Sequence, residues 1–374
     1  RPATMQTLRI LAVAGALLAA ACDAPEPRPL PEAADLPFRG TKPLSPMGKV
    51  DFTMPAASGE PYDFHRETEG RVALLFFGYT YCPDICAIHM ATLARALEGL
   101  EPEERARVEV VFVTVDPERD TPERLRGWLD AFDSTFVGVR GSMEEIEEAL
   151  AYYRYPPPER SADGQVYTVG HPALIYAFTP DGLGRVMYGP ETSRQAWLHD
   201  LRMMLGYPWE VWEEDGAEGA AEPSAHGGGA AAEAPGSSDD AGAVLGVAGS
   251  VQVLDAYAPA PADGERTAVY LTLRNTGPGA DTLRTLATPA ATSASLHDMR
   301  TDGSGMMRMV PIEGVAVPAG ESVMLAPGRR HGMLEGVGAG RMEPGDTIRA
   351  TLTFARGGEV TVPVRVVSYD ALGG

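Results

Sequence analysis

An abrupt change of composition between residues 207 and 243 divides this chain in two. Glu, Asp, Gly, Ala, Pro and Ser make up most of the stretch, which has almost no residue able to build a hydrophobic core. We therefore predict a disordered linker over 207–243. The segments on either side are each long enough to form a domain. About 35 residues of flexible chain span on the order of 30 Å, so the linker lets two domains meet without fixing their geometry.

Charge narrows the choice of partners. The formal net charge is -21, and such a chain is repelled by nucleic acid and by an anionic membrane surface. Nucleic acid is therefore not expected as a partner. Much of the acidic charge lies in one tract after residue 209, so the net charge is partly a property of the linker.

Residues 1–22 resemble a bacterial lipoprotein signal peptide. Arg9 is followed by an apolar run that is too short to span a bilayer as a stable helix. The run ends Leu-Ala-Ala-Ala-Cys, which resembles a lipobox and implies that Cys22 carries a lipid anchor. Asp23 resembles the signal that retains lipoproteins at the inner membrane, so we expect a tether over 23–44 on the periplasmic side of that membrane. A cleaved signal peptide without lipidation is the alternative.

The segment 45–206 is predicted to be an α/β domain with a central sheet. From residue 71 onward, short apolar strands alternate with amphipathic helical stretches. Thr121 before Pro122 is typical of a helix N-cap and first turn. The clearest strands are 72–77 and 108–113, and the expected helices are 85–100, 122–132, 142–154 and 191–206.

The segment 244–374 has a different pattern. Runs of β-branched and apolar residues at 268–273 and 360–367 are broken by Gly and Pro, and no long helical pattern occurs. This pattern predicts an all-β domain, either an antiparallel sandwich or a barrel.

Cys82 and Cys86 are the cysteines that remain once Cys22 is set aside. They follow a predicted strand in the sequence Gly-Tyr-Thr-Tyr-Cys-Pro-Asp-Ile-Cys, so Cys82 should lie at or just before a helix N-terminus, where the dipole favours a thiolate. Cys86, one turn later, would share its face. The pair can act as a redox dithiol, or as two soft ligands for Cu(I) or zinc that need a further ligand. A pair that merely stabilises the fold is the alternative.

This cysteine motif, the sequence Val-Asp-Pro-Glu-Arg-Asp-Thr-Pro at 115–122, and a histidine before the apolar strand 173–178 resemble the Sco/SenC family of thioredoxin-like copper proteins. The resemblance covers about residues 45–206. It implies a thioredoxin-like fold and a copper site, with Cu(I) expected and Cu(II) admitted. The implied copper ligands are Cys82, Cys86 and His171.

The neighbours of His171 depart from the family pattern. Gly170 and Pro172 stand where the family usually has an Asp and a Ser or Thr, so one expected hydrogen-bond partner for the imidazole is missing. Pro172 falls where thioredoxin folds place a cis proline, so we expect a cis bond between His171 and Pro172. Without the resemblance, His171 also fits a buried core histidine.

Other polar residues fit structural roles better than metal binding. Asp116 and Asp120 suit loop and capping positions, because carboxylates prefer harder ions. The remaining histidines of the first segment and the linker are expected to be solvated; they are His65, His89, His199 and His226.

The second segment carries histidines and methionines at the spacing H-x11-M-x21-H-x-M. Imidazole and thioether groups form a soft Cu(I) site that no disulfide can disable. The spacing resembles the PCu(A)C family of cupredoxin-like periplasmic copper chaperones over about residues 246–368. The implied ligands are His297, Met309, His331 and Met333. Three nearby methionines are expected to fill the core; they are Met299, Met306 and Met307.

Both resemblances imply a copper chaperone that delivers Cu(I) to the binuclear CuA centre of cytochrome c oxidase subunit II. Reduction of the client's cysteines by Cys82 and Cys86 is an additional activity that the dithiol permits. Two alternatives stay open. One is a thiol-disulfide oxidoreductase with incidental copper binding, and the other is a copper-sequestering protein without a client.

Overall fold

The computed structural model describes residues 36–372 apart from 164–165, 210–242, 263 and 339–341. The predicted signal peptide with Cys22, most of the predicted tether and most of the predicted linker lie outside these residues. Within the described residues, no helix has the length and the hydropathy to cross a membrane.

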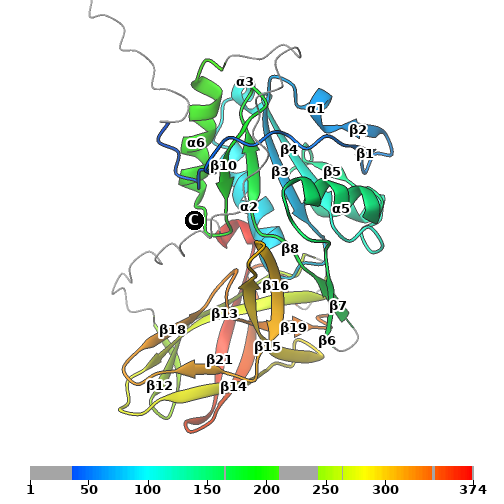
Figure 1. The fold of residues 1–374 in the computed structure, drawn as a ribbon. Coiled ribbons are helices and arrows are strands. Elements are labelled where there is room, and N and C mark those ends of the chain that lie inside the picture. The colour runs from blue at the N-terminus through cyan, green and yellow to red at the C-terminus, as the bar shows by residue number, and fades with distance from the viewer. Residues whose placement is uncertain (1–35, 164–165, 210–242, 263, 339–341, 373–374) are drawn as a thin grey trace, which may run out of the picture. The chain divides into compact units, whose positions relative to one another are not determined.

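A five-stranded sheet forms the centre of the first domain, in the order β10-β9-β3-β4-β5 (Figure 1). β3, β4 and β5 run parallel, whereas β9 is antiparallel to β3 and β10 to β9. Every residue of β3 is buried, as expected for a strand covered on both faces. The strands are β3 (Val72–Gly78), β4 (Val108–Thr114), β5 (Val137–Val139), β9 (Ile175–Phe178) and β10 (Gly184–Tyr188).

Helices cover both faces of this sheet. Phe76 packs against His89 of one helix, and Phe77, which points to the opposite face, packs against Tyr153 at the end of another. Thr121 accepts a hydrogen bond from the Arg124 N–H, which confirms the predicted N-cap. The four predicted helices are confirmed, with ends that differ by up to three residues: α2 (Ile85–Leu97), α4 (Pro122–Asp130), α5 (Met143–Tyr152) and α6 (Arg194–Gly206).

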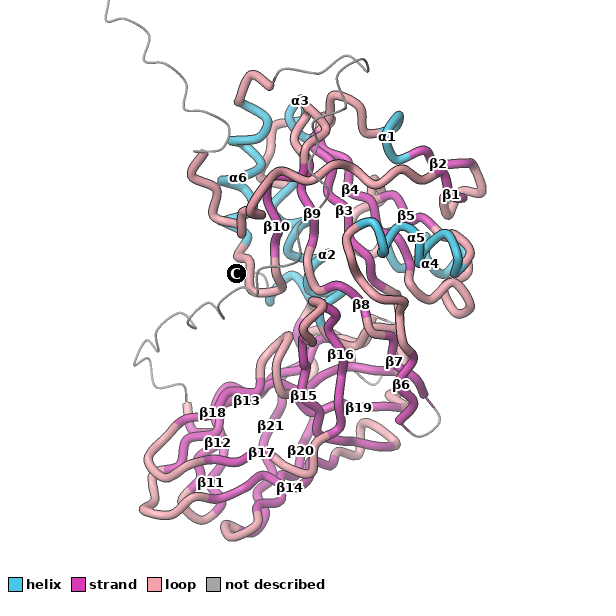
Figure 2. Tube along the Cα trace, viewed as in Figure 1, coloured by secondary structure: helices cyan, strands magenta, loops and turns pink. Residues whose placement is uncertain are grey.

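Short elements complete the first domain and connect its layers (Figure 2). They are β1 (Thr53–Pro55), β2 (Pro61–Asp63), α1 (Phe64–Glu67), α3 (Pro102–Arg105), β6 (Arg160–Asp163), β7 (Val166–Val169) and β8 (His171–Pro172). The thioredoxin-like α/β prediction is confirmed.

The second domain is built from strands around its own apolar core. β13 belongs to two sheets, because its first half pairs with β19 and its second half with β18. This arrangement confirms the all-β sandwich and its cupredoxin-like class, with one parallel pair, β12 and β21. The strands are β11 (Val244–Ala248), β12 (Val251–Pro259), β13 (Arg266–Asn275), β14 (Asp281–Ala287), β15 (Ser293–Thr301), β16 (Met306–Pro311), β17 (Val315–Val317), β18 (Ser322–Leu325), β19 (His331–Glu335), β20 (Thr347–Phe354) and β21 (Gly358–Val367), followed by the 3-10 helix η3 (Tyr369–Leu372).

A short strand of the first domain joins a sheet of the second. β8 pairs with β16, with Met306 opposite Pro172 and Met307 opposite His171. The described residues contain no cis peptide bond, so the predicted cis bond before Pro172 is wrong. The physical reason lies in the pairing, because two successive residues can face a neighbouring strand only if the backbone between them stays extended.

Asp200 ties the start of the first domain to α6. Its carboxylate accepts hydrogen bonds from the backbone N–H groups of Arg39 and Gly40 and from the Tyr188 hydroxyl, at 2.9–3.0 Å. We expect Asp200→Ala to lower the free energy of unfolding of this domain by about 2–4 kcal/mol, because it leaves partly buried donors without an acceptor.

Urea unfolding followed by tryptophan fluorescence measures this effect. All four tryptophans precede residue 213, so the signal does not arise from the second domain. Asp200→Asn keeps the side-chain volume and one acceptor oxygen, so it should lower the free energy of unfolding by less than Asp200→Ala does. Equal stability of Asp200→Ala and the unchanged protein would contradict the assignment.

Candidate metal centres

The loop between β3 and α2 places both cysteines. β3 ends at Gly78 and α2 begins at Ile85, so Cys82 lies three residues before the helix and Cys86 in its first turn. The Cys82 N–H donates to the Tyr79 carbonyl at 3.2 Å, which tightens the loop. A Cβ atom at Gly78 would lie 3.0 Å from the Cys86 sulfur, so only glycine leaves room for the thiol there.

Cys82, Cys86 and His171, the set that the family resemblance implied, come together. Nε2 of His171 lies 3.9 Å from the Cys82 sulfur and 3.6 Å from the Cys86 sulfur. The three ligand atoms all lie within 4.8 Å of one another, and all three residues are buried. Ligand bonds of about 2.3 Å for sulfur and about 2.0 Å for nitrogen, the values known for zinc, give separations of this size around one ion. The cluster therefore has the chemistry and the dimensions of a soft metal site.

Backbone carbonyls orient the imidazole of His171. Nδ1 lies 3.0 Å from the Phe77 oxygen and 2.9 Å from the Pro172 oxygen, so it must donate a proton to them. Nε2, the atom that faces the thiols, is thereby left to donate a proton to the Cys82 thiolate or, without that proton, to offer its lone pair to a metal. The acidic neighbour that the family pattern would supply is replaced by these two carbonyls.

The two thiols differ in their acidity. Burial raises the pKa of Cys82, but hydrogen bonds with Cys86 and His171 outweigh it and bring this pKa well below its ordinary value. Burial and the negative charge of Cys82 together raise the pKa of Cys86. Cys82 is therefore the thiolate of the pair. The sequence predicted this thiolate from a helix N-terminus, whereas its neighbours in the site supply most of the effect.

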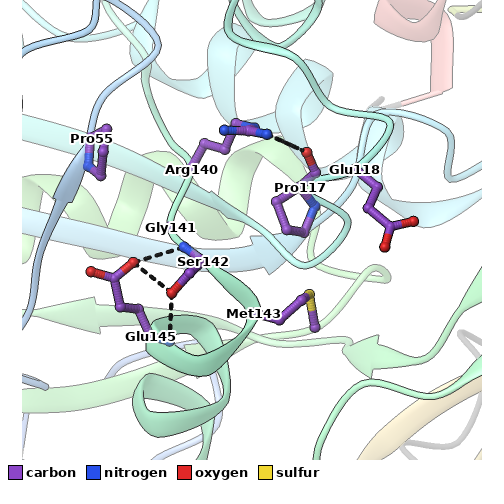
Figure 3. A pocket seen from close by; sticks show the side chains of 8 residues that line it. All are labelled: Pro55, Pro117, Glu118, Arg140, Gly141, Ser142, Met143 and Glu145. Atoms are coloured by element: carbon purple, nitrogen blue, oxygen red, sulfur yellow. Dashed lines mark hydrogen bonds between the residues drawn. The ribbon is translucent and has the colours of Figure 1, made fainter.

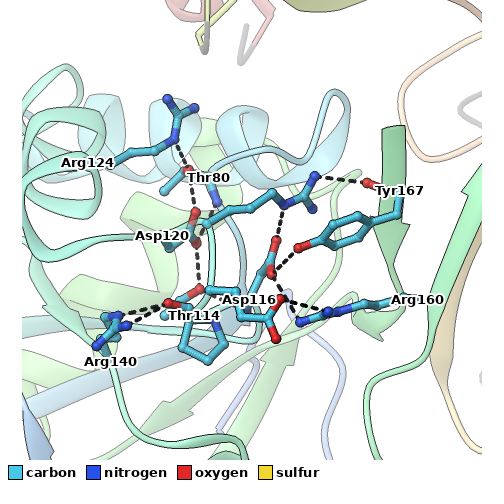
Figure 4. A network of polar contacts seen from close by, with 11 residues as sticks. Thr80, Thr114, Asp116, Asp120, Arg124, Arg140, Arg160 and Tyr167 are labelled. Atoms are coloured by element: carbon cyan, nitrogen blue, oxygen red, sulfur yellow. Dashed lines mark hydrogen bonds and ion pairs between the residues drawn. The ribbon is translucent and has the colours of Figure 1, made fainter. Parts of the chain in front are cut away.

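A buried polar network holds the loop that precedes the cysteines (Figure 4). Asp120 accepts hydrogen bonds from the N–H and the hydroxyl of Thr80, at 3.0 and 2.6 Å, and from the hydroxyl of Thr114. Asp116 accepts one from the Tyr167 hydroxyl at 2.9 Å. Neither carboxylate belongs to the metal-binding cluster, so the predicted loop role of Asp116 and Asp120 is consistent with the structure.

The four predicted ligands of the second domain lie on one face of neighbouring strands. His297 of β15 stands opposite His331 of β19, and Met333 is two residues further along β19. His297 also stands opposite Pro311 of β16, two residues after Met309. Because opposed residues share a face and side chains alternate along a strand, all four side chains point the same way.

The histidine geometry at this second cluster fits a soft metal ion. The rings of His297 and His331 are 6.0 Å apart and nearly parallel. Nδ1 of His331 donates to the Arg329 carbonyl at 2.9 Å, which assigns the lone pair to Nε2. That Nε2 is buried without a hydrogen-bond partner among the described residues. An unpartnered buried nitrogen on a strand face that also carries two methionines suits a Cu(I) ligand set.

Asp84, between the two cysteines, was not singled out in the sequence. Its carboxylate is buried and accepts hydrogen bonds from the Tyr270 hydroxyl at 2.6 Å and the Gly328 N–H at 3.0 Å. It also lies 3.9 Å from Nδ1 of His331. The loop of the first cluster thus contacts the second cluster directly.

The other histidines and methionines lie outside the two predicted ligand sets. His89 is buried, so the prediction that it is solvated is wrong; its Nε2 lies 2.9 Å from the Ala173 oxygen, and burial lowers its pKa to about 4. His65 is exposed, and His199 is partly exposed beside Asp200. His226 lies outside the described residues. The three nearby methionines pack in or against the apolar core, as predicted: Met299, Met306 and Met307.

A surface pocket of about 470 Å³ is lined by residues that belong to neither cluster (Figure 3). It contains no cysteine or histidine, and its polar groups already have partners. Arg140 donates to the Pro117 carbonyl, and Ser142 and Glu145 form a helix capping box. We assign it no function.

Removing His171 tests the origin of the Cys82 thiolate. We expect His171→Ala to raise the pKa of Cys82, because the hydrogen bond and the positive charge that favour the thiolate are lost. In the reduced, copper-free protein, the midpoint of Cys82 alkylation against pH should move to higher pH, measured by peptide mass spectrometry. His65→Ala is the control and should leave the midpoint unchanged. An unchanged midpoint in His171→Ala would show that the imidazole does not set this pKa.

Comparisons with known proteins agree with both domains. Residues 43–206 match the SCO1/SenC family model, and residues 251–366 match the model of the LpqE-like lipoproteins. The mitochondrial SCO2 homolog of Mus musculus is 33% identical over 158 residues, which are 42% of this chain and 62% of the mouse protein. The chain thus spans less than two thirds of that relative.

Two solved structures resemble the first domain. Apo Sco1 from Thermus thermophilus is 34% identical and covers 45% of this chain and 96% of its own, with a TM-score of 0.40. Bradyrhizobium japonicum ScoI with copper bound is 29% identical and covers 42% of this chain and 99% of its own, with a TM-score of 0.38. On the family models, residues 43–206 of this chain form a SCO1/SenC domain and residues 251–366 form an LpqE-like domain.

Proposed function

We propose that this protein is a copper chaperone that holds Cu(I) at two sites and delivers it to the CuA centre of cytochrome c oxidase subunit II. The observation that carries the proposal is the convergence of Cys82, Cys86 and His171, with Nε2 of His171 facing both sulfurs. Two thiolates and an imidazole select Cu(I) over hard cations. The second site adds two imidazoles and two thioethers, which suit the same ion.

The two sites have different chemistry. The first contains thiols, which an oxidant can convert to a disulfide and so remove from copper binding. The second contains no thiol and keeps its ligands under oxidising conditions. A chain that works on the periplasmic side of the inner membrane, held there by a lipid on Cys22, would benefit from both kinds of site.

The unequal acidity of the thiols favours a second activity at the first site. A thiolate at Cys82 beside a protonated Cys86 is the state in which a dithiol attacks a disulfide. Cys82 would form the mixed disulfide with a client, and Cys86 would then resolve it. Reduction of the client's cysteines would prepare them for copper.

Copper stoichiometry tests the two-site proposal. We expect the full chain to hold two Cu(I) ions against a chelator, and Cys82→Ser/Cys86→Ser and His297→Ala/His331→Ala to hold one each, measured by competition titration. Met324→Leu alters an exposed methionine of β18 and should still bind two. If the unchanged chain retains no Cu(I) against a weak competitor, the proposal fails.

Delivery is tested by mixing the copper-loaded chain with an apo CuA domain and measuring copper in the separated proteins. His171→Ala separates the two activities. We expect it to abolish delivery from the first site while Cys82 and Cys86 still reduce a disulfide. The comparison is made in the His297→Ala/His331→Ala chain, in which only the first site can carry copper. Unchanged delivery after His171→Ala would contradict the role of His171, and no delivery even with His171 present would favour an oxidoreductase with incidental copper binding.

A further inference from the structure

The two proposed copper sites share one continuous sheet face. The strand order is β19-β15-β16-β8, and three register pairs cross it: His331 with His297, Met309 with Met299, and Met307 with His171. Opposed side chains lie on the same face, and so do alternate side chains along one strand. His171 of the first site and the ligands of the second therefore point to the same side of one sheet.

The cysteine loop lies over this face and contacts both of its ends. Cys82 and Cys86 approach His171, whereas Asp84 approaches His331 and binds Tyr270 and Gly328. Neighbouring strands are about 4.8 Å apart, so three intervals separate the backbones of β8 and β19 by roughly 14 Å. That distance is too long for one ligand exchange but short enough to be divided into steps.

Met307 occupies the interval between the sites. It stands opposite His171, and it lies two residues from Met309 on the same strand face, a distance of about 7 Å along the strand. It is buried in the same apolar cluster as Cys82 and Cys86. Its thioether is a neutral, soft ligand of the kind that binds Cu(I) without holding it as tightly as a thiolate does.

We propose that Met307 is an intermediate Cu(I) ligand, through which copper moves between the two sites within one chain while the two domains stay in contact. The inference rests on the proposed function, because it requires that both sites bind Cu(I). In each step one bond from copper to sulfur or nitrogen forms while another breaks, and the metal stays Cu(I). Cys82 is already a thiolate, so only Cys86 releases a proton when copper arrives and takes one up when copper leaves.

Oxidation of the cysteine pair allows copper to be placed on the second site first. The two sulfurs lie within 4.8 Å of each other, so the pair can be closed to a disulfide, and one equivalent of Cu(I) is then added. A phosphine then reduces the disulfide to two thiols and becomes a phosphine oxide, with oxygen from water. Movement of copper to the thiolates appears as ultraviolet charge-transfer absorption. Disulfide reduction is timed separately on the copper-free chain, at a phosphine concentration that makes it faster than the copper step.

The expected result is a first-order rate that does not depend on protein concentration. Met307→Leu keeps the apolar volume but removes the sulfur, and it should slow this rate at least tenfold. Met324→Leu removes an exposed methionine and should leave the rate unchanged. Competition titration and thermal unfolding are measured in parallel, and both should match the unchanged protein in Met307→Leu.

Three results would overturn the inference. An unchanged rate in Met307→Leu would show that Met307 only packs. A rate that rises in proportion to protein concentration would show that copper moves between chains. Failure of the disulfide form to bind Cu(I) would remove the second site itself, and this result alone would also defeat the two-site proposal.

Discussion

The pairing of β8 with β16 is the contact that positions His171 of the first cluster and connects it to the strands of the second. β8 has only two residues, His171 and Pro172, and its partner strand belongs to the other domain. A slip of one residue in this register would turn the imidazole of His171 to the opposite face, away from the thiols. The first site is therefore completed by a strand of the second domain, although all three of its ligands belong to the first. The extended backbone also brings the Pro172 carbonyl within reach of Nδ1.

Local features of the sequence predicted much of this structure. Helix periodicity located α2, α4, α5 and α6, because an amphipathic helix repeats its apolar residues at a fixed interval. The convergence of His171 on Cys82 and Cys86 came from a family resemblance rather than from spacing, since 85 residues separate His171 from Cys86. The face shared by the second set of ligands followed from their spacing along strands, once the register was known.

Contacts between distant residues could not be predicted in the same way. Asp84 binds groups that lie 186 and 244 residues further along the chain, so no local pattern marks its carboxylate as a contact. His89 was expected to be solvated because a histidine on a helix usually is, but Phe76 and the Ala173 carbonyl enclose it. The cis bond was expected by analogy with thioredoxin folds, and the analogy failed where β16 pairs with the segment that contains Pro172.

Burial of the ligands has a consequence for recognition. All seven predicted ligands are less than 10% exposed: Cys82, Cys86, His171, His297, Met309, His331 and Met333. Under the proposed function, a client that takes copper would have to open contacts between the two domains, such as the pairing of β8 with β16 and the approach of Asp84 to His331. Each domain would then compete with the client for the other. Such a client would need an extended strand that can pair with β8 and a soft side chain at the position of Met307. The choice of client would therefore depend on how well it competes for this one surface.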